Sequence, residues 1–196
     1  YEMLRSLVGS EMCIRDRLFE KQVGKSVCLP YGITAVRGYE TLRLEKQGVH
    51  LKEERKRKSG EEVPIPVPAG WEEEKSLTFA ENPVTIVKKT SVFPERIEEK
   101  KYTKWLDYDK IEKNPYIRTR RTGDYMVINA QGNTKKLNRC MIDEKIPSEY
   151  RDSIPLIACG KEILWMVGSR MNERYKINPQ TRKVLVLNYQ GGNENE

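Results

Sequence analysis

Short runs of alternating apolar and polar residues, separated by turn-forming residues, recur along the sequence. Because successive side chains of a strand point to opposite faces, each run predicts a short, half-buried strand. Alternation is clearest at residues 25–29, 35–44 and 102–109. Short runs of β-forming residues at 77–79, 84–87, 116–121, 125–128, 163–167, 175–177 and 184–187 also predict strands. The pattern predicts an α+β, strand-rich fold, with short helices packed on an antiparallel sheet.

Prolines and glycines limit how these runs can pair. Pro30-Tyr31-Gly32 lies between the first two runs and predicts a hairpin-like turn. Residues 63–67 alternate Val and Ile with proline, which has no backbone N–H to donate across a sheet. This segment is therefore predicted to be an edge strand or an extended connector.

Two short helices are expected in the C-terminal half. Thr134 is placed to cap a helix that runs through about Ile142, because its hydroxyl can accept from an unpaired backbone amide. In that helix Leu137 and Met141 share a face, four residues apart. Pro147 suits the first turn of a second helix across residues 148–152.

Changes of composition divide the chain into four parts. Residues 1–17 are expected to be a non-native or disordered leader, since VGSEMCIRDR resembles a translated sequencing-adapter string and the character of the chain changes at Leu18. The alternative is a genuine amphipathic N-terminal helix. We expect a β-rich connecting region at 18–101, a C-terminal domain at 102–190 and a disordered tail at 191–196. Because the first residue is Tyr1 rather than Met, we expect a piece of a longer protein.

Positive charge is concentrated in the C-terminal half. The formal net charge is +7, and residues 118–183 hold 14 Lys and Arg against 7 Asp and Glu. A local excess of this kind favours a polyanionic partner over a pocket for an acidic substrate. The charge run LKEERKRKSG at 51–60 contains glutamates as well, so a solvated loop is favoured over a nucleic-acid-binding arm.

Cysteine and histidine spacing predicts neither a metal site nor a disulfide framework. The four cysteines are scattered without a C-x-x-C spacing, and His50 is the sole histidine. We interpret the cysteines as buried or incidental thiols of a reducing compartment, which favours a cytoplasmic location. No apolar run approaches the roughly 20 residues that span a bilayer, so we expect no membrane partner.

Catalytic motifs are absent from the sequence. Gly24-Lys25-Ser26 resembles the end of a phosphate-binding loop, but Phe19 stands where its first glycine is required. Neither G-x-S-x-G nor H-E-x-x-H occurs. Asp107 and Asp109 would share one face of a strand and could hold Mg²⁺, although capping or ion pairing is favoured for both.

Lysine and arginine side chains of the basic half form a candidate nucleic-acid site. On one strand, Arg118 and Arg120 would place their guanidinium groups about 6 to 7 Å apart, which suits successive phosphates. The candidate residues are Arg118, Arg120, Arg121, Lys135, Lys136, Arg139, Lys145, Arg151, Arg170, Arg174 and Lys176. For each residue the competing interpretation is a solvated surface cation.

The basic half also resembles a known family. Four pieces carry the similarity: R-x-R-R-x-G-D at 118–124, Lys-Lys-Leu at 135–137, the segment from Lys145 to Pro155, and Leu164-Trp165 through Arg170. Their order and spacing resemble the C-terminal domain of bacterial tRNA(Ile)-lysidine synthetase. Upstream, LPYG at 29–32 and RGYE at 37–40 extend the similarity to roughly residues 18–190.

The resemblance implies a function and a partner. The family uses ATP and Mg to adenylate the wobble cytidine of tRNA(Ile) with a CAU anticodon, and lysine then displaces AMP. That chemistry belongs to a catalytic domain with an S-G-G-x-D-S loop, which this sequence lacks. The chain alone is therefore expected to be inactive and to hold no cofactor.

By resemblance, residues 102–190 bind the tRNA acceptor-stem region, and the fold is similar to a module of the phenylalanyl-tRNA synthetase β subunit. The expected partners are tRNA(Ile) and the catalytic domain, and a homodimer is left open. Two alternatives remain. One is a stand-alone structural or protein-interaction domain with a solubilising basic face, and the other is a complete independent enzyme.

Overall fold

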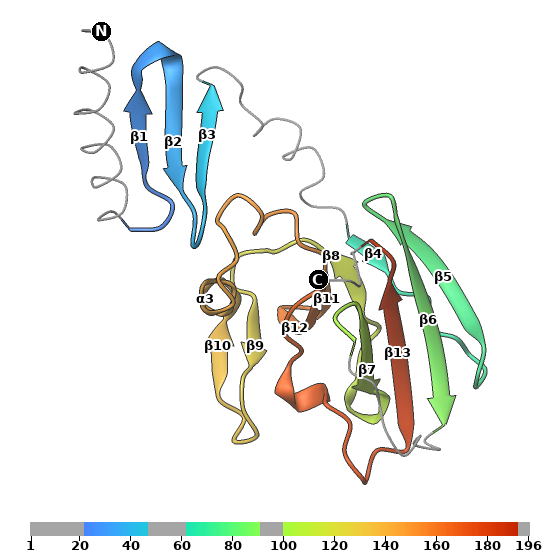
Figure 1. Cartoon of the computed structure of the whole chain (residues 1–196). Coiled ribbons are helices and arrows are strands. Elements are labelled where there is room, and N and C mark those ends of the chain that lie inside the picture. Colours follow the sequence, from blue (N-terminus) through green and yellow to red (C-terminus); the bar gives the residue numbers. More distant parts are fainter. Residues whose placement is uncertain (1–21, 47–61, 91–99, 192–196) are drawn as a thin grey trace, which may run out of the picture. The chain divides into compact units, whose positions relative to one another are not determined.

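The computed structural model describes residues 22–46, 62–90 and 100–191, which form two compact units (Figure 1). The first comprises Tyr1–Arg57 with Pro147–Glu149, and the second comprises Lys58–Ile146 with Tyr150–Glu196. The division between these units lies near residue 57, because strands between residues 62 and 90 pair with strands from the C-terminal part. The leader at 1–17, the charge run at 51–60 and residues 192–196 of the tail lie outside the described residues.

The first unit contains an antiparallel three-stranded sheet. Its strands are β1 (Ser26–Leu29), β2 (Ile33–Arg37) and β3 (Leu42–Lys46), in that order. The expected turn at Pro30–Gly32 joins β1 to β2, and Tyr31 there has a φ of 64°. The run at 35–44 forms two strands rather than one, because the chain turns where Gly38 N donates to Thr41 O.

A four-stranded antiparallel sheet forms one layer of the second unit. Its order is β5-β6-β13-β7. The bounds are β5 (Glu74–Phe79), β6 (Asn82–Thr90), β7 (Thr103–Asp107) and β13 (Lys183–Tyr189). Central β13 pairs with both β6 and β7, so segments almost a hundred residues apart lie side by side (Figure 1).

A six-stranded mixed sheet forms the next layer, in the order β10-β9-β12-β11-β8-β4. The bounds are β4 (Glu62–Pro64), β8 (Tyr116–Arg118), β9 (Tyr125–Val127), β10 (Thr134–Lys136), β11 (Leu156–Cys159) and β12 (Glu162–Met166). β4 lies at an edge, as its proline requires. β9 and β12 pair in parallel, and the other neighbours are antiparallel.

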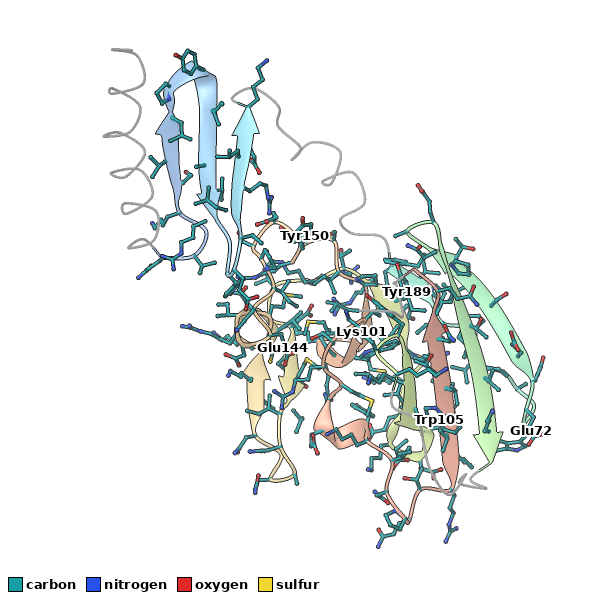
Figure 2. The ribbon with its side chains drawn as sticks, viewed as in Figure 1. Glu72, Lys101, Trp105, Glu144, Tyr150 and Tyr189 are labelled. Atoms are coloured by element: carbon teal, nitrogen blue, oxygen red, sulfur yellow. The ribbon has the colours of Figure 1, made fainter. Side chains whose placement is uncertain are left out.

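Apolar side chains from both sheets form the main core (Figure 2). Ile86, Leu106 and Leu187 come from the four-stranded sheet and meet Ile117 and Trp165 from the six-stranded sheet. A bulge lies between Ile157 and Ala158 in the pairing of β11 with β12. It lets the consecutive residues Leu164 and Trp165 both enter this core, which strict alternation would forbid.

The single α-helix of the described residues, α3 (Leu137–Asp143), buries Leu137, Cys140 and Met141. These side chains pack with Leu156, Ile163 and Met166 of the six-stranded sheet in a second core. The shared face of Leu137 and Met141 is thus confirmed. Thr134 as N-cap was wrong: it begins β10, and Lys136 caps the helix without a side-chain hydrogen bond.

Two further predictions, of a helix and of a strand, were wrong. Residues 148–152 form turns instead of a second α-helix. The predicted strand at 175–177 is replaced by the 3₁₀ turn η3 (Glu173–Tyr175), followed by a bridge from Lys176 to Leu106. A further 3₁₀ turn, η2, spans Tyr108–Lys110. The fold is mostly β, and within the described residues no helix is long and apolar enough to cross a membrane.

Candidate nucleic-acid interface

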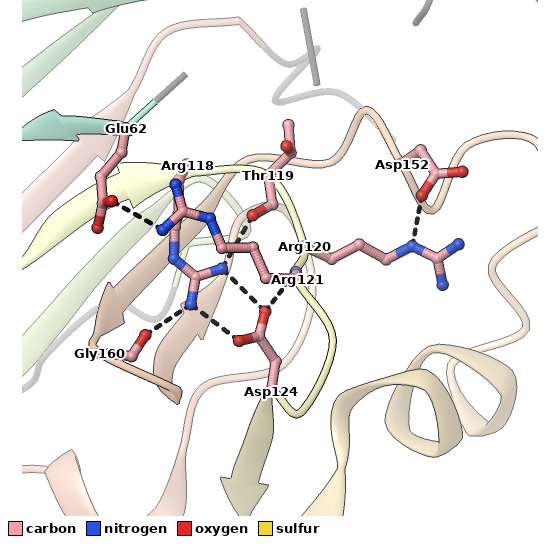
Figure 3. A network of polar contacts seen from close by, with 8 residues as sticks. All are labelled: Glu62, Arg118, Thr119, Arg120, Arg121, Asp124, Asp152 and Gly160. Atoms are coloured by element: carbon pink, nitrogen blue, oxygen red, sulfur yellow. Dashed lines mark hydrogen bonds and ion pairs between the residues drawn. The ribbon is translucent and has the colours of Figure 1, made fainter. Parts of the chain in front are cut away.

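Arg118 is buried, which contradicts its expected place on a surface strand face. The strand β8 ends at Arg118, so Arg118 and Arg120 do not share a strand, and the Arg118 side chain is 1% exposed. Its two terminal nitrogens donate to both carboxylate oxygens of Asp124 at 2.8 and 2.9 Å, and to the carbonyl oxygens of Thr119 and Gly160 at 2.9 and 2.6 Å (Figure 3). A phosphate cannot reach this guanidinium, so Arg118 has a structural role.

Asp124 organises the turn that carries the neighbouring arginines. Its carboxylate accepts from Arg121 N at 2.8 Å, and its carbonyl accepts from Leu137 N, the first residue of α3, at 2.9 Å. Gly123, which precedes it, has a φ of 92°, a conformation that favours glycine. The buried pair therefore fixes the turn and the start of α3 together.

Arg120 and Arg151 meet at α3. Both donate to the side-chain oxygen of Asn138, at 3.3 and 3.5 Å, and Arg120 Nε also donates to Asp152 at 2.6 Å. Arg120 points away from the buried pair (Figure 3). We call Arg120, Lys136, Arg139 and Arg151 the α3 cluster, because these cations lie on α3, on its N-cap or against Asn138.

Lys136 and Arg139 are the members of this cluster whose charge is least compensated. Both are exposed, and no side chain in the described part of the chain pairs with either. They lie three residues apart, a spacing that brings side chains near one another at a helix start. Lys135, by contrast, forms an ion pair with Asp143.

The remaining candidate cations lie apart from this cluster or already have an ion-pair or hydrogen-bond partner. Arg121 pairs with Glu62 at 2.7 Å, and Arg170 donates to the carbonyl of Ile128 at 2.8 Å. Arg174 and Lys176 lie in or beside η3, where they pair with Glu162 and Glu173. Lys145 follows α3 with a φ of 54°. Apart from Arg121, the exposed candidate cations therefore fall into two groups, at α3 and at η3.

Asp107 and Asp109 have structural partners. Asp107 is buried, accepts from Thr181 Oγ1 at 2.8 Å and pairs with Lys110 at 2.9 Å. Asp109 accepts from Arg182 N and Lys183 N. Among the described residues no group of three potential ligands could hold a metal ion. Capping and ion pairing thus account for both carboxylates.

A cavity of about 270 Å³ lies near η3, and nothing in the sequence pointed to it. Lys110, Lys113, Tyr125, Lys161 and Tyr175 are among the residues that line it, and 65 positions separate the first from the last, so no local motif could reveal it. Burial raises the pKa of the Tyr175 hydroxyl, and the nearby Glu162 carboxylate raises it further.

Free thiols in the described residues differ in exposure: Cys28 is exposed, Cys159 is half-buried and Cys140 is buried. Burial raises the pKa of Cys159 to about 11, helped by the charge of Glu162. Burial likewise raises the pKa of Cys140. Lysine and arginine side chains lie near both thiols, but burial outweighs them, so neither thiol has the lowered pKa of a reactive cysteine.

Comparisons with known proteins show what the C-terminal part of the chain is similar to. Residues 116–188 match the family described as the TilS substrate C-terminal domain. This segment contains the buried Arg118–Asp124 pair, α3 and most of β13.

Relatives over a longer stretch carry the name tRNA(Ile)-lysidine synthase, a synonym of synthetase. The protein of Caldanaerobacter subterraneus is 36% identical over 172 residues, which cover 88% of this chain and 34% of the relative. That of Clostridium tetani is 40% identical over 95 residues, covering 48% of this chain and 20% of the relative. The chain thus spans about a third or less of the length of these curated relatives.

A solved structure supports the same relationship. The crystal structure of a TilS C-terminal domain matches with a TM-score of 0.53 at 27% identity, covering 68% of this chain and 98% of that chain. The chain is therefore homologous to the C-terminal part of tRNA(Ile)-lysidine synthases, and its residues 116–188 match the TilS substrate C-terminal domain.

Proposed function

We propose that this chain binds tRNA through the α3 cluster and is the tRNA-binding part of a tRNA(Ile)-lysidine synthase. The observation that carries the proposal is the pair of exposed cations Lys136 and Arg139, which no side chain of the described residues compensates. They lie on a helix start that the buried Arg118–Asp124 pair holds in place. In this proposal the partner is tRNA(Ile) with a CAU anticodon. ATP, Mg and the ligation of lysine belong to the rest of the enzyme.

Arg120 can join Lys136 and Arg139 at modest cost. Its pair with Asp152 is partly exposed, and exposed ion pairs contribute only about 0 to 1 kcal/mol. A guanidinium can exchange such a carboxylate for an RNA phosphate, to which it can donate two parallel hydrogen bonds. Arg151 is held by the carbonyl of Ile146 at 2.9 Å, so it is presented with little remaining freedom.

Phosphate contacts predict a salt dependence that distinguishes this role from a solubilising surface. Each neutralised phosphate releases condensed counterions, so log Kd should change with log salt in proportion to the number of contacts. Substituting a contacting cation should lower that slope by about 1. Solubilising charges would leave tRNA binding absent or insensitive to salt.

The test measures the binding of fluorescently labelled tRNA(Ile) to the full 196-residue chain by anisotropy over a salt series. The Lys136→Ala/Arg139→Ala variant should lower the slope by about 2 relative to the unsubstituted chain. The matched control is Arg182→Ala/Lys183→Ala, which removes the same two charges from an exposed site on the other sheet. Equal slopes for both variants would overturn the proposal.

A second assay addresses the catalytic expectation. The chain should incorporate no lysine into tRNA when given ATP and Mg, because the S-G-G-x-D-S loop of the family is absent from its sequence. ATP-dependent incorporation by this chain alone would contradict that expectation.

A further inference from the structure

The cavity near η3 has walls from four separate segments. Lys113 follows η2, Tyr125 begins β9, Lys161 and Glu162 lie at the turn between β11 and β12, and Arg174 comes from η3. Its volume of about 270 Å³ is close to the lower end of ligand pockets, which start at about 300 Å³. A small ligand, up to about the size of a single nucleotide, suits this space.

Hydrogen bonds hold the walls in place. Arg118 donates to Gly160 O at 2.6 Å, and Tyr125 N donates to Lys161 O at 3.1 Å. Tyr125 also lies opposite Glu162 in the parallel pairing of β9 with β12. The buried arginine that fixes the α3 turn therefore also fixes the β11–β12 turn, so the cavity is formed before any ligand arrives.

The charge of the lining favours an anion. Lys110, Lys113, Lys161 and Arg174 oppose two carboxylates, Glu112 and Glu162. Within the described part of the chain, Lys113 and Lys161 have no ion-pair partner. The Glu162 carboxylate already has partners, because it pairs with Arg174 at 3.5 Å and accepts from Asn172 at 3.3 Å.

Aromatic and acidic groups beside these lysines extend the match from phosphate to nucleotide. Tyr125 is half-buried and is among the residues that line the cavity, so a base could stack on its ring. A carboxylate such as Glu112 can accept from an exocyclic amino group of a base. The cavity thus offers what a nucleotide needs: lysines to bind the phosphate, a tyrosine ring to stack on the base, and a carboxylate to accept from an amino group of the base.

We propose that this cavity binds one nucleotide unit, with its phosphate at Lys113 and Lys161 and its base on Tyr125. The nucleotide can come from two sources: an unpaired residue of bound RNA, which rests on the proposed tRNA function, or a free mononucleotide, which does not. With either source, the proposed nucleotide site lies outside the α3 cluster.

The experiment uses the full chain with two probes. The RNA probe is a short hairpin with one bulged nucleotide, compared with the same hairpin fully paired. The free probe is AMP. Its binding is monitored by the NMR chemical shifts of the backbone amides of Tyr125, Gly160 and Lys161. Lys113→Ala/Lys161→Ala removes the phosphate contacts at exposed positions, and Arg182→Ala/Lys183→Ala is the matched control.

An RNA source predicts about 10-fold tighter binding of the bulged hairpin, a typical value for one stacked base. The Lys113→Ala/Lys161→Ala variant should lose this preference, and the control should keep it. A free-nucleotide source predicts saturable AMP shifts of the three amides, lost in the same variant. If neither the preference nor the shifts occur, the inference is overturned. Salt-dependent tRNA binding through Lys136 and Arg139 could survive that result, so the two failures are distinguishable.

Discussion

Arg118 and Asp124 form a buried ion pair joined by two hydrogen bonds of 2.8 and 2.9 Å, with both side chains only 1% exposed. The guanidinium also donates to the backbone carbonyls of Thr119 and Gly160, and the carboxylate accepts from the backbone amide of Arg121. This pair links β8, the arginine-bearing turn and the β11–β12 turn.

Arg118→Ala should lower the free energy of unfolding by about 3 to 5 kcal/mol, because it leaves Asp124 buried without its partner. Arg120→Ala should cost less than about 1 kcal/mol, since its ion pair is partly exposed. Urea denaturation followed by tryptophan fluorescence measures both. Similar losses for the two variants would refute the structural role of Arg118.

Gly168→Ala should destabilise the chain for two reasons. Its φ is 76°, and an added Cβ would lie 2.8 Å from a ring carbon of Tyr102. Gly132→Ala is the matched control, with a φ of 81° and nothing within 4 Å of the added Cβ. Thermal or urea denaturation should show an extra loss of about 1 to 3 kcal/mol at position 168, the usual cost of overpacking. Equal losses would mean that the Tyr102 ring moves aside freely.

Lys145→Gly should stabilise the chain. Ile146 N donates to Met141 O and Lys145 N donates to Ile142 O, which is the Schellman pattern of a helix end. That pattern places Lys145 in the left-handed region at a φ of 54°, where glycine is favoured. We expect a gain of about 0.5 to 1 kcal/mol, the scale of left-handed strain at one residue. Glu144→Gly, at a φ of −76°, should give no such gain.

Cys159 should resist alkylation at neutral pH. Burial raises its pKa to about 11 from the usual 9, so the thiol stays protonated where the unfolded chain has begun to ionise. Iodoacetamide labelling read by mass spectrometry should be slower at Cys159 than at exposed Cys28, and should rise toward pH 11. The same shift stabilises the fold below pH 9, and that contribution should be lost as the pH rises toward 11. Equal labelling of both cysteines at pH 8 would contradict the assigned burial.

The sequence predicted most strands because alternation and short runs of β-forming apolar residues both report which side chains are buried. β6, β7, β12 and β13 all overlap predicted runs. β11 was missed, since Leu156–Ala158 are buried without alternation in a strand flanked on both sides. β10 was read as helix because Thr134 resembles a cap, whereas the pairing of Lys135 with Met126 extends the sheet.

The candidate site was harder to predict than the strands. Arginine is usually exposed, so the R-x-R-R-x-G-D motif suggested surface cations, with Arg118 and Arg120 on one strand face. The aspartate that ends the motif is the partner that buries Arg118, and its place after Gly123 was the available clue. The cavity near η3 had no clue of this kind, because tertiary pairing alone brings Lys113 to Lys161.

Lysine acetylation footprinting with and without tRNA(Ile) tests the central claim most directly. Lys136 and Lys183 are both exposed, but only Lys136 belongs to the α3 cluster. The account predicts that bound tRNA slows acetylation of Lys136 and leaves Lys183 at its original rate, as read by mass spectrometry. Unchanged acetylation of Lys136 at saturating tRNA would contradict it.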